Sequence, residues 1–219
     1  MMTLYGDLRS RAHRVAWMLK ELGTPFEHVP THFLDGSTRT PEYLGINPNG
    51  RVPALKDGDL VLFESLAINL YLARKHGGPL APVDLREEAL ATQWTIWVLT
   101  EIEKPLLLTA ANLFLFAEDE RNAQEAAAMT RKLSRPFKVL DAHLRERPYL
   151  LGDRFTVADL NVSSVMTLAP LSSMDLGEWP ALNAWLSRCL ERPAAADWKP
   201  IKFRIPRPPT PLAMLESFV

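Results

Sequence analysis

The sequence predicts a two-domain protein in which an α/β domain is followed by an all-helical domain. Patterns of short strands and helices alternate over residues 1–77, in the order β-α-β, an intervening segment, β-β-α. From residue 85 onward the strand patterns disappear, and windows with helical periodicity follow. The 219 residues are enough for two units that each bury their own core. We therefore expect domains at residues 1–77 and 85–198, joined by a short linker.

The first domain is expected to contain four short strands and two helices in the order of a thioredoxin-like sheet. The expected strands are residues 3–5, 26–29, 51–55 and 60–63, and the expected helices are residues 12–22 and 65–74. The first helix has a broad apolar face around Trp17, and Gly23 ends it. The turn sequence at residues 56–59 predicts a hairpin between the last two strands. Because Pro53 has no N–H for a sheet ladder, its strand should be interrupted, at an edge or a bulge.

The second domain is expected to be entirely helical. Its helical windows are residues 86–103, 119–145, 157–168 and 180–191. Thr156 and Asp159 have the spacing of a capping box, so Asp159 is predicted to stabilise the fold and not to take part in chemistry. The last stretch, residues 199–219, contains five prolines between positions 200 and 211. Since proline can neither continue a helix nor donate to a sheet, we expect this tail to run extended over the surface.

Composition and charge exclude several classes of protein. The net charge is −1, so the basic surface that nucleic acid requires is absent. No stretch approaches the ~18 uninterrupted apolar residues of a membrane span, and the N-terminus lacks the features of a signal peptide. The single cysteine, Cys189, cannot form an internal disulfide, which is typical of the reducing cytoplasm. The five histidines do not form a pair on one helix face, so no metal site is expected.

One motif is specific enough to indicate a family. The run Asn-Pro-Asn-Gly-Arg-Val-Pro-Ala-Leu at residues 47–55 is followed by Glu64-Ser65. This combination resembles the N-terminal domain of the glutathione S-transferase family, of theta-like or bacterial type. The resemblance implies glutathione as co-substrate. It also implies a cis bond before Pro53, which leaves the N–H and C=O of the preceding residue free to pair with the cysteine of the tripeptide.

The expected catalytic residue is Ser10. The segment Tyr-Gly-Asp-Leu-Arg-Ser at residues 5–10 aligns without gaps with the start of theta-like transferases, in which this serine donates a hydrogen bond to the glutathione sulfur. No Cys-x-x-Cys lies between the first strand and helix, so the thiol must come from glutathione. Two alternatives stay open. Ser10 could be an ordinary N-cap, or Tyr5 could supply the hydroxyl, as the corresponding tyrosine does in alpha, mu and pi transferases.

The expected tripeptide site has three parts. Arg51, Val52 and Pro53 would face the backbone and cysteine of glutathione. Glu64 and Ser65 lie where a strand ends and a helix begins, so they can receive the ammonium and carboxylate of the γ-glutamyl end. Thr38 or Arg39 lies where the family often uses a basic or polar side chain, and one of them is expected to bind the glycine carboxylate of glutathione.

The expected activity is attack of the glutathione thiolate on a hydrophobic electrophile. An apolar set in the helical domain is a candidate lining for the electrophile pocket, comprising Trp94, Trp97, Leu113, Phe114 and Phe116, although such sets are more often core. Family members are typically homodimers, so a homodimer is expected. The alternative is a binding or scaffolding protein that keeps the fold and the tripeptide site but has no turnover.

Overall fold

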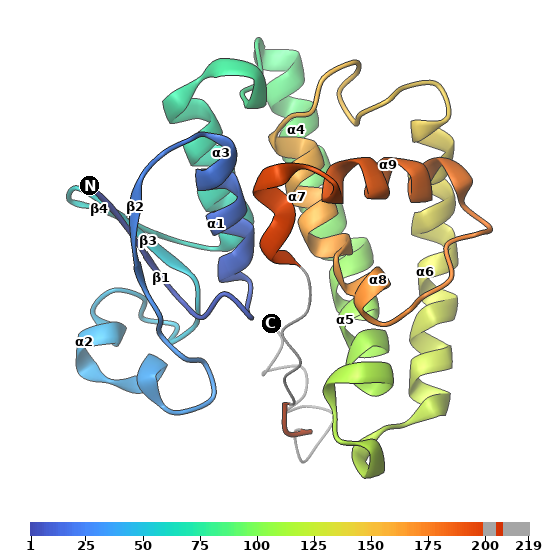
Figure 1. Cartoon of the computed structure of the whole chain (residues 1–219), viewed down its shortest axis with the longest axis horizontal. Coiled ribbons are helices and arrows are strands. Elements are labelled where there is room, and N and C mark those ends of the chain that lie inside the picture. The colour runs from blue at the N-terminus through green and yellow to red at the C-terminus, as the bar shows by residue number, and fades with distance from the viewer. Residues whose placement is uncertain (199–204, 208–219) are drawn as a thin grey trace.

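A computed structural model of the chain describes residues 1–198 and 205–207. The first part of the chain forms a small sheet flanked by helices, and the rest forms a bundle of helices beside it (Figure 1). Helices α1 (Ala12–Glu21) and α3 (Ser65–His76) lie between the sheet and the helical bundle (Figure 1). The predicted thioredoxin-like domain followed by an all-helical domain is confirmed. The boundaries at residues 77 and 85 stay a prediction.

The sheet has four strands in the order β2-β1-β3-β4. Their bounds are β1 (Met2–Tyr5), β2 (Phe26–Val29), β3 (Ala54–Asp57) and β4 (Leu60–Phe63). Strand β1 runs parallel to β2 and antiparallel to β3, and β3 forms a hairpin with β4. The paired residues Leu4 and Leu55 are buried in the main core, which continues through α1 and α3 into the helical domain.

The prediction that Pro53 interrupts an edge strand was wrong. Strand β3 begins at Ala54, one residue after the proline, and it is an inner strand between β1 and β4. An inner strand needs every N–H for its two ladders, and a residue without one is tolerated only outside them. Val52 and Pro53 therefore form the approach to the sheet and not part of it.

Three short helices complete the first part of the chain and the linker: η1 (Ser37–Arg39), α2 (Pro41–Leu44) and η2 (Gly78–Leu80). The hydroxyl of Thr40 caps α2 by accepting from the N–H of Tyr43 at 3.3 Å. Figure 1 shows α2 at the end of the sheet, away from the helical domain. The segment between β2 and β3 therefore lies at the C-terminal end of β1, where the turn that precedes α1 also lies.

The helical domain contains six α-helices among the described residues. Its elements are α4 (Leu85–Trp97), the π-helical turn η3 (Val98–Glu103), α5 (Lys104–Ala110), the π-helical turn η4 (Ala111–Leu115), η5 (Glu118–Glu120), α6 (Ala123–Leu144), α7 (Val157–Met166), α8 (Leu168–Leu171), α9 (Pro180–Leu190) and η6 (Pro193–Trp198). The sequence did not predict α5. Pro105 lies in its first turn, directly after η3, and a widened π-helical turn tolerates a residue that cannot donate to the preceding turn.

Helix α7 lies at the centre of the molecule, and all ten of its residues are buried. It packs against α1 and α3 of the first domain and against α4 and α9 of its own. The predicted capping box is confirmed: the Asp159 carboxylate accepts from the N–H of Thr156 at 3.0 Å, and the Thr156 hydroxyl caps the first turn. Asp159 also accepts from the indole N–H of Trp185 at 3.0 Å, so it joins α7 to α9.

Of the predicted tail, residues 205–207 are described, and the rest of residues 199–219 lies outside the described part of the chain. The N–H of Ile205 donates to the carbonyl of Leu115 at 3.1 Å. Arg207 donates to Asn112 and forms an ion pair with Glu125 at 2.6 Å. Residues 205–207 thus pack against the helical domain without helix or strand structure, and the extended conformation of the tail stays a prediction. Within the described residues, no helix has the length and apolar character that crossing a membrane requires.

Candidate active site

Strand β1 leads through Gly6 into a tight turn at residues 7–10 that precedes α1. Gly6 has a φ of +139°, a value that residues with a side chain rarely adopt. A Cβ here would lie 2.8 Å from the Cβ of Ala12 and 3.1 Å from the Cβ of Val52. The missing side chain therefore brings the turn, the start of α1 and the approach to β3 into direct contact.

Asp7 holds this turn on two sides. Its N–H donates to the carbonyl of Thr31 at 2.9 Å, and its carboxylate accepts from the N–H of Arg9 at 2.8 Å. The Arg9 guanidinium also pairs with the carboxylate, and these hydrogen bonds lower the pKa of Asp7. A ring nitrogen of His28 lies 2.7 Å from the carbonyl of Gly6 and fixes the approach to the turn.

Ser10, the predicted catalytic residue, ends the turn and is partly buried. Its hydroxyl donates to the carbonyl of Asp7 at 2.6 Å and accepts from the N–H of Ala12 at 3.2 Å. Arg11 precedes the first residue of α1 and makes no side-chain capping bond, whereas the Ser10 hydroxyl accepts one free N–H of the helix, so the alternative interpretation of Ser10 as an N-cap stays open. Because a hydroxyl hydrogen rotates freely, this donor can turn from the carbonyl to another acceptor nearby.

Tyr5, the alternative catalytic residue, is the last residue of β1. Its ring packs edge to face against Tyr43, with ring centroids 6.4 Å apart. In the sheet it pairs with Val29 on one side and Ala54 on the other. This contact gives Tyr5 a packing role of the kind that aromatic side chains have at the end of many sheets.

The Val52-Pro53 peptide bond is cis, as the family resemblance implied. Pro53 is buried and Val52 is half-buried. The carbonyl of Arg51 accepts from the hydroxyl of Tyr43 and from the side-chain amide of Asn47, both at 2.7 Å. Burial raises the pKa of Tyr43 to about 12, so this hydroxyl stays a donor at neutral pH. The segment that carries the predicted tripeptide contacts is therefore held from behind by two side chains.

Glu64 and Ser65 lie at the N-terminus of α3, as predicted. Ser65 is buried, whereas Glu64 is exposed and its backbone has φ of 70° and ψ of 103°. A residue other than glycine in this region is strained by ~1–3 kcal/mol, and such strain is concentrated at functional sites. The Glu64 side chain makes no capping hydrogen bond to α3. Its carboxylate therefore does not serve as the cap of this helix.

Thr38 and Arg39 lie beside the turn that precedes Arg51. Gly50 has a φ of +59°, and a Cβ there would lie 2.6 Å from the Arg39 guanidinium and 2.9 Å from the Thr38 carbonyl. Arg39 donates to the carbonyl of Asn49 at 3.5 Å. Arg39 is exposed, but Thr38 is buried, so Arg39 is the better placed of the two for an external carboxylate.

The helical domain brings one carboxylate to the start of α1. Glu103 accepts from Arg11 Nε at 2.9 Å and from Arg14 Nη2 at 2.7 Å. Burial raises the pKa of Glu103, but the two arginines outweigh burial and bring that pKa down to about 2. Arg14 is buried too, and the carboxylate of Glu64 adds to the field that favours its charged form. Glu103 therefore joins the helical domain to the first turn of α1, one position after Ser10.

Several of these residues escaped the sequence analysis. Tyr43 and Asn47 both bind the Arg51 carbonyl, and the Asn-Pro-Asn-Gly turn was the only local signal for Asn47. Glu103 lies 92 positions from Arg11, so nothing local connects the two.

The predicted electrophile lining is not one cluster. Trp94 and Trp97 belong to the main core, where their rings pack edge to face, and Leu113 is 44% exposed. Phe114 and Phe116 belong to a second apolar cluster. We call it the second cluster; its buried members are Leu108, Ala111, Leu115, Phe116 and Ile205, and its partly buried members are Phe33, Leu107, Phe114 and Met129. Helix periodicity could not separate the two sets because they share one continuous helical stretch.

Comparison with known proteins identifies the family. The model described as "Glutathione S-transferase, N-terminal domain" matches residues 1–74, and the one described as "Glutathione S-transferase, C-terminal domain" matches residues 104–193. Together they cover more than half of the chain. The chain belongs to the glutathione S-transferase family.

Two similar relatives in this family come from Zea mays. Glutathione S-transferase 1 is 37% identical over 207 residues, which cover 88% of this chain and 93% of the relative. Glutathione S-transferase 3 is 36% identical over 222 residues, which cover 95% and 96%.

Solved transferase structures share the fold over most of its length. The theta class glutathione S-transferase of Xanthomonas axonopodis pv. citri, with glutathione bound, has a TM-score of 0.82 and 32% identity, covering 89% of this chain and 94% of that one. A glutathione S-transferase I with bound lactoylglutathione has a TM-score of 0.81 and 34% identity, covering 90% and 97%. The resemblance based on residues 5–10 and 47–65 is thus confirmed at the level of the family.

Proposed function

We propose that this transferase uses Ser10 to stabilise the thiolate of glutathione for attack on a hydrophobic electrophile. The observation that carries the proposal is the Ser10 hydroxyl, held at the end of a turn one position before the N-cap of α1. Membership of the family makes glutathione the co-substrate. Family membership also favours turnover over the alternative of a protein that only binds the tripeptide.

The chemistry to be solved is ionisation of the thiol. A thiol with pKa near 8.5 is only a few per cent ionised at neutral pH. A hydrogen bond to a charged acceptor contributes ~1.5–3 kcal/mol, which corresponds to roughly one to two pKa units. The free N–H groups at the start of α1 act in the same direction. Ser10 keeps its own proton, while the thiol proton leaves to solvent. The sulfur then forms a bond to the electrophilic atom as the bond from that atom to its leaving group breaks, and the leaving group departs with the electron pair.

The tripeptide is proposed to bind along the segments that meet beside Gly6. The N–H and C=O of Val52 would pair with the cysteine of glutathione, next to the turn that carries Ser10. Glu64 would accept from the γ-glutamyl ammonium, and Ser65 with the first N–H groups of α3 would receive the α-carboxylate. Arg51 and Arg39 would supply positive charge toward the glycine end, with Thr38 behind them.

Replacing Ser10 by Ala tests the proposal. The pKa of bound glutathione should rise by roughly one to two units, because only the charged thiol accepts the hydroxyl hydrogen bond. Thiolate absorbance followed across pH in the two proteins measures this shift. Binding of the tripeptide, measured by calorimetry, should be nearly unchanged. Equal pKa values would remove Ser10 from the mechanism, and the Tyr5→Phe variant would then be expected to show the shift.

The electrophile is proposed to meet the second cluster. Phe33 contributes to this cluster from the first domain, next to His32, whose ring stacks on it and whose Nε2 lies 3.6 Å from the Asp7 carboxylate. The second cluster is therefore linked through Phe33 and His32 to the turn that carries Ser10. Replacing Phe33 by Ala should raise KM for an apolar electrophile and leave glutathione affinity unchanged. An unaltered KM would argue for another binding surface.

A homodimer is proposed, with α4 at the contact between the two copies. This helix and the turn η3 that continues it expose a stripe of apolar side chains, namely Leu85, Ala89 and Ile96 of α4 and Leu99 of η3. Light scattering of the variant with Leu85→Asp and Ile96→Asp should give the mass of a monomer. Val139→Asp, at an exposed position of α6, is the matched control and should stay dimeric. A monomeric parent would overturn the proposal.

We place the protein in the cytoplasm. Its lone cysteine, Cys189, is buried, and burial raises the pKa of that thiol, so the protein has no reactive thiol of its own among the described residues. Reduced glutathione is abundant only where thiols stay reduced. Fractionation of cells that express the tagged full chain would test this location.

A further inference from the structure

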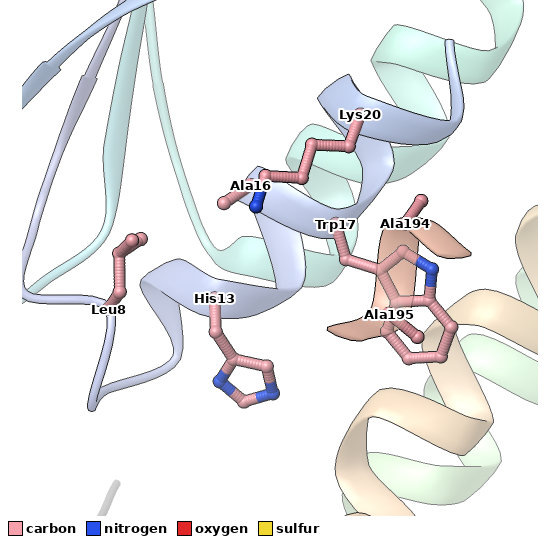
Figure 2. Close-up of a pocket in the computed structure, with 7 residues that line it drawn as sticks. All are labelled: Leu8, His13, Ala16, Trp17, Lys20, Ala194 and Ala195. Atoms are coloured by element: carbon pink, nitrogen blue, oxygen red, sulfur yellow. The ribbon is translucent and has the colours of Figure 1, made fainter. Parts of the chain in front are cut away.

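His13 lies in the first turn of α1, and its ring lies next to the catalytic turn (Figure 2). Its Nδ1 is 2.7 Å from the carbonyl oxygen of Ser10, which also receives the backbone N–H of His13 at 3.2 Å. The side-chain contact is thus the shorter of the two. Figure 2 shows the ring pointing away from the axis of α1, and His13 lines the pocket together with Leu8, Trp17 and Ala195.

The surroundings of the ring fix its protonation. Burial lowers the pKa of His13 to about 4, against the opposing effect of the Ser10 and Ser164 carbonyls, and the charges of Arg14 and Arg11 act in the same direction as burial. The ring is therefore neutral at pH 7. Because a carbonyl oxygen can only accept, Nδ1 carries the hydrogen. The other ring nitrogen, Nε2, is buried and makes no hydrogen bond of regular geometry within the described residues, although the Ser164 carbonyl is near enough to act on the ring.

We propose that His13 is a positioning residue for the transferase reaction, holding the Ser10 carbonyl so that the Ser10 hydroxyl stays in reach of the sulfur. This inference rests on the proposed role of Ser10. The peptide plane before Ser10 is fixed by the N–H that donates to Asp7 at 2.9 Å, and the plane after it is fixed by His13. With both planes held, the direction of the Cα–Cβ bond is set. A catalytic hydrogen bond gains from such preorganisation because little motion is left to restrict.

Three substitutions of His13 separate the hydrogen bond from the volume of the ring. His13→Asn puts an amide N–H near the position of Nδ1, His13→Gln puts it near the position of Nε2, and His13→Leu removes the donor. Thiolate absorbance of bound glutathione should show the thiol pKa raised by about one unit in the Leu and Gln variants. It should lie close to the parent value in the Asn variant. In the Leu and Gln variants kcat should fall, while KM for glutathione should be nearly unchanged.

A double variant shows whether His13 acts through Ser10. In the Ser10→Ala background, His13→Leu should add no further pKa shift, because the hydroxyl that it positions is gone. A shift in Ser10→Ala without any shift in the Leu and Gln variants would overturn the role of His13 and leave the proposed function standing. A thiol pKa that is raised in the Asn variant as much as in the Leu variant would also overturn the role of His13. The volume of the ring, and not its hydrogen bond, would then be what matters. If the Leu variant does not fold, the difference in thiol pKa between the Asn and Gln variants tests the proposal by itself.

Discussion

At the scale of single residues, Glu64 combines strain with exposure. Its backbone has φ of 70°, yet the side chain makes no capping bond to the helix that it precedes. Glycine would adopt this conformation without strain. A glutamate at this position lowers the stability of the fold. In our proposal its carboxylate is kept there because it binds the ammonium group of glutathione.

Two substitutions of Glu64 separate these effects. Glu64→Ala and Glu64→Gly should both weaken glutathione binding by ~1.5–3 kcal/mol, the contribution of a charged hydrogen bond. Only glycine relieves the strain, so the Gly variant should be more stable than the Ala variant by roughly 1–2 kcal/mol. Calorimetric titration and urea unfolding measure the two quantities. Undiminished affinity in both variants would contradict the assignment of Glu64 to the tripeptide site.

Glu103 makes the stability of the fold depend on pH in the acid range. Its pKa in the folded protein is lowered to about 2, so its contribution is complete above its usual value near 4.5 and is lost as pH falls toward 2. At 1.36 kcal/mol per unit the full effect is roughly 3 kcal/mol. Urea unfolding should show Glu103→Gln less stable than the parent by ~3–5 kcal/mol at pH 7, since Arg14 is left buried without its partner. This difference should shrink by about 1 kcal/mol at pH 3.5. A gap that is constant with pH would mean that the pKa of Glu103 is the same in the folded and the unfolded protein.

Sequence alone could predict the residues of the site that lie in local motifs. Ser10, Pro53, Glu64 and Ser65 lie where a strand meets a turn or a helix, and such junctions have recognisable sequences. Glu103, by contrast, reaches Arg11 and Arg14 only after the two domains pack. Long-range packing carries no local signal, and this is also why the grouping of Trp94 with Phe116 was wrong.

At the scale of elements, α9 has its N-terminus capped by a neighbouring helix. Trp179, at its N-cap, supplies no side-chain acceptor. Instead the buried carboxylate of Asp141, in α6, accepts from the N–H of Ala181 at 2.8 Å and of Leu182 at 3.2 Å. The sequence predicted both helices from their periodicity but could not predict this connection, because a cap from another helix has no fixed spacing along the chain.

Asp141→Ala should therefore destabilise the protein by roughly 1–2 kcal/mol, the scale of a lost helix cap. Asp141→Asn retains a side-chain oxygen, and asparagine caps about as well as aspartate. Thermal unfolding should find the Asn variant much closer to the parent than the Ala variant. Equal destabilisation of the two would show that the charge of Asp141, and not its acceptor oxygen, is what matters.

At the scale of the whole molecule, a clamp joins the end of α1 to the end of α9. Arg192 forms two hydrogen bonds with the Glu21 carboxylate, both at 2.7 Å, and its guanidinium lies 4.0 Å from the centre of the Phe155 ring. The indole N–H of Trp17 donates to the same carboxylate at 3.0 Å. The first and second domains are thus joined at the end of α1, through Glu21 and Arg192, as well as at its start, through Arg11, Arg14 and Glu103.

Arg192→Ala should lower the free energy of unfolding by roughly 1.5–3 kcal/mol, because Glu21 loses a charged partner. Arg145→Ala is the comparison: this arginine pairs with the buried carboxylate of Asp141, but its own side chain is 68% exposed, so solvent screens its charge and the loss should be smaller. Urea unfolding followed by tryptophan fluorescence compares the two. Equal losses would mean that the clamp adds nothing beyond an ordinary surface ion pair.

The burial of α7 has a consequence for how the chain is made. Helix α3 ends at His76, whereas α7, which covers both α1 and α3, ends at Met166. At ~5–20 residues per second, the ribosome needs roughly 5–20 s to supply that cover. During this interval the nascent first domain exposes the apolar faces of two helices and the uncompensated charge of Arg14. Substitutions in α7 should for this reason lower the yield of native protein during synthesis, even where the free energy of unfolding of the finished chain changes little. Pulse proteolysis of stalled nascent chains would measure this loss of yield.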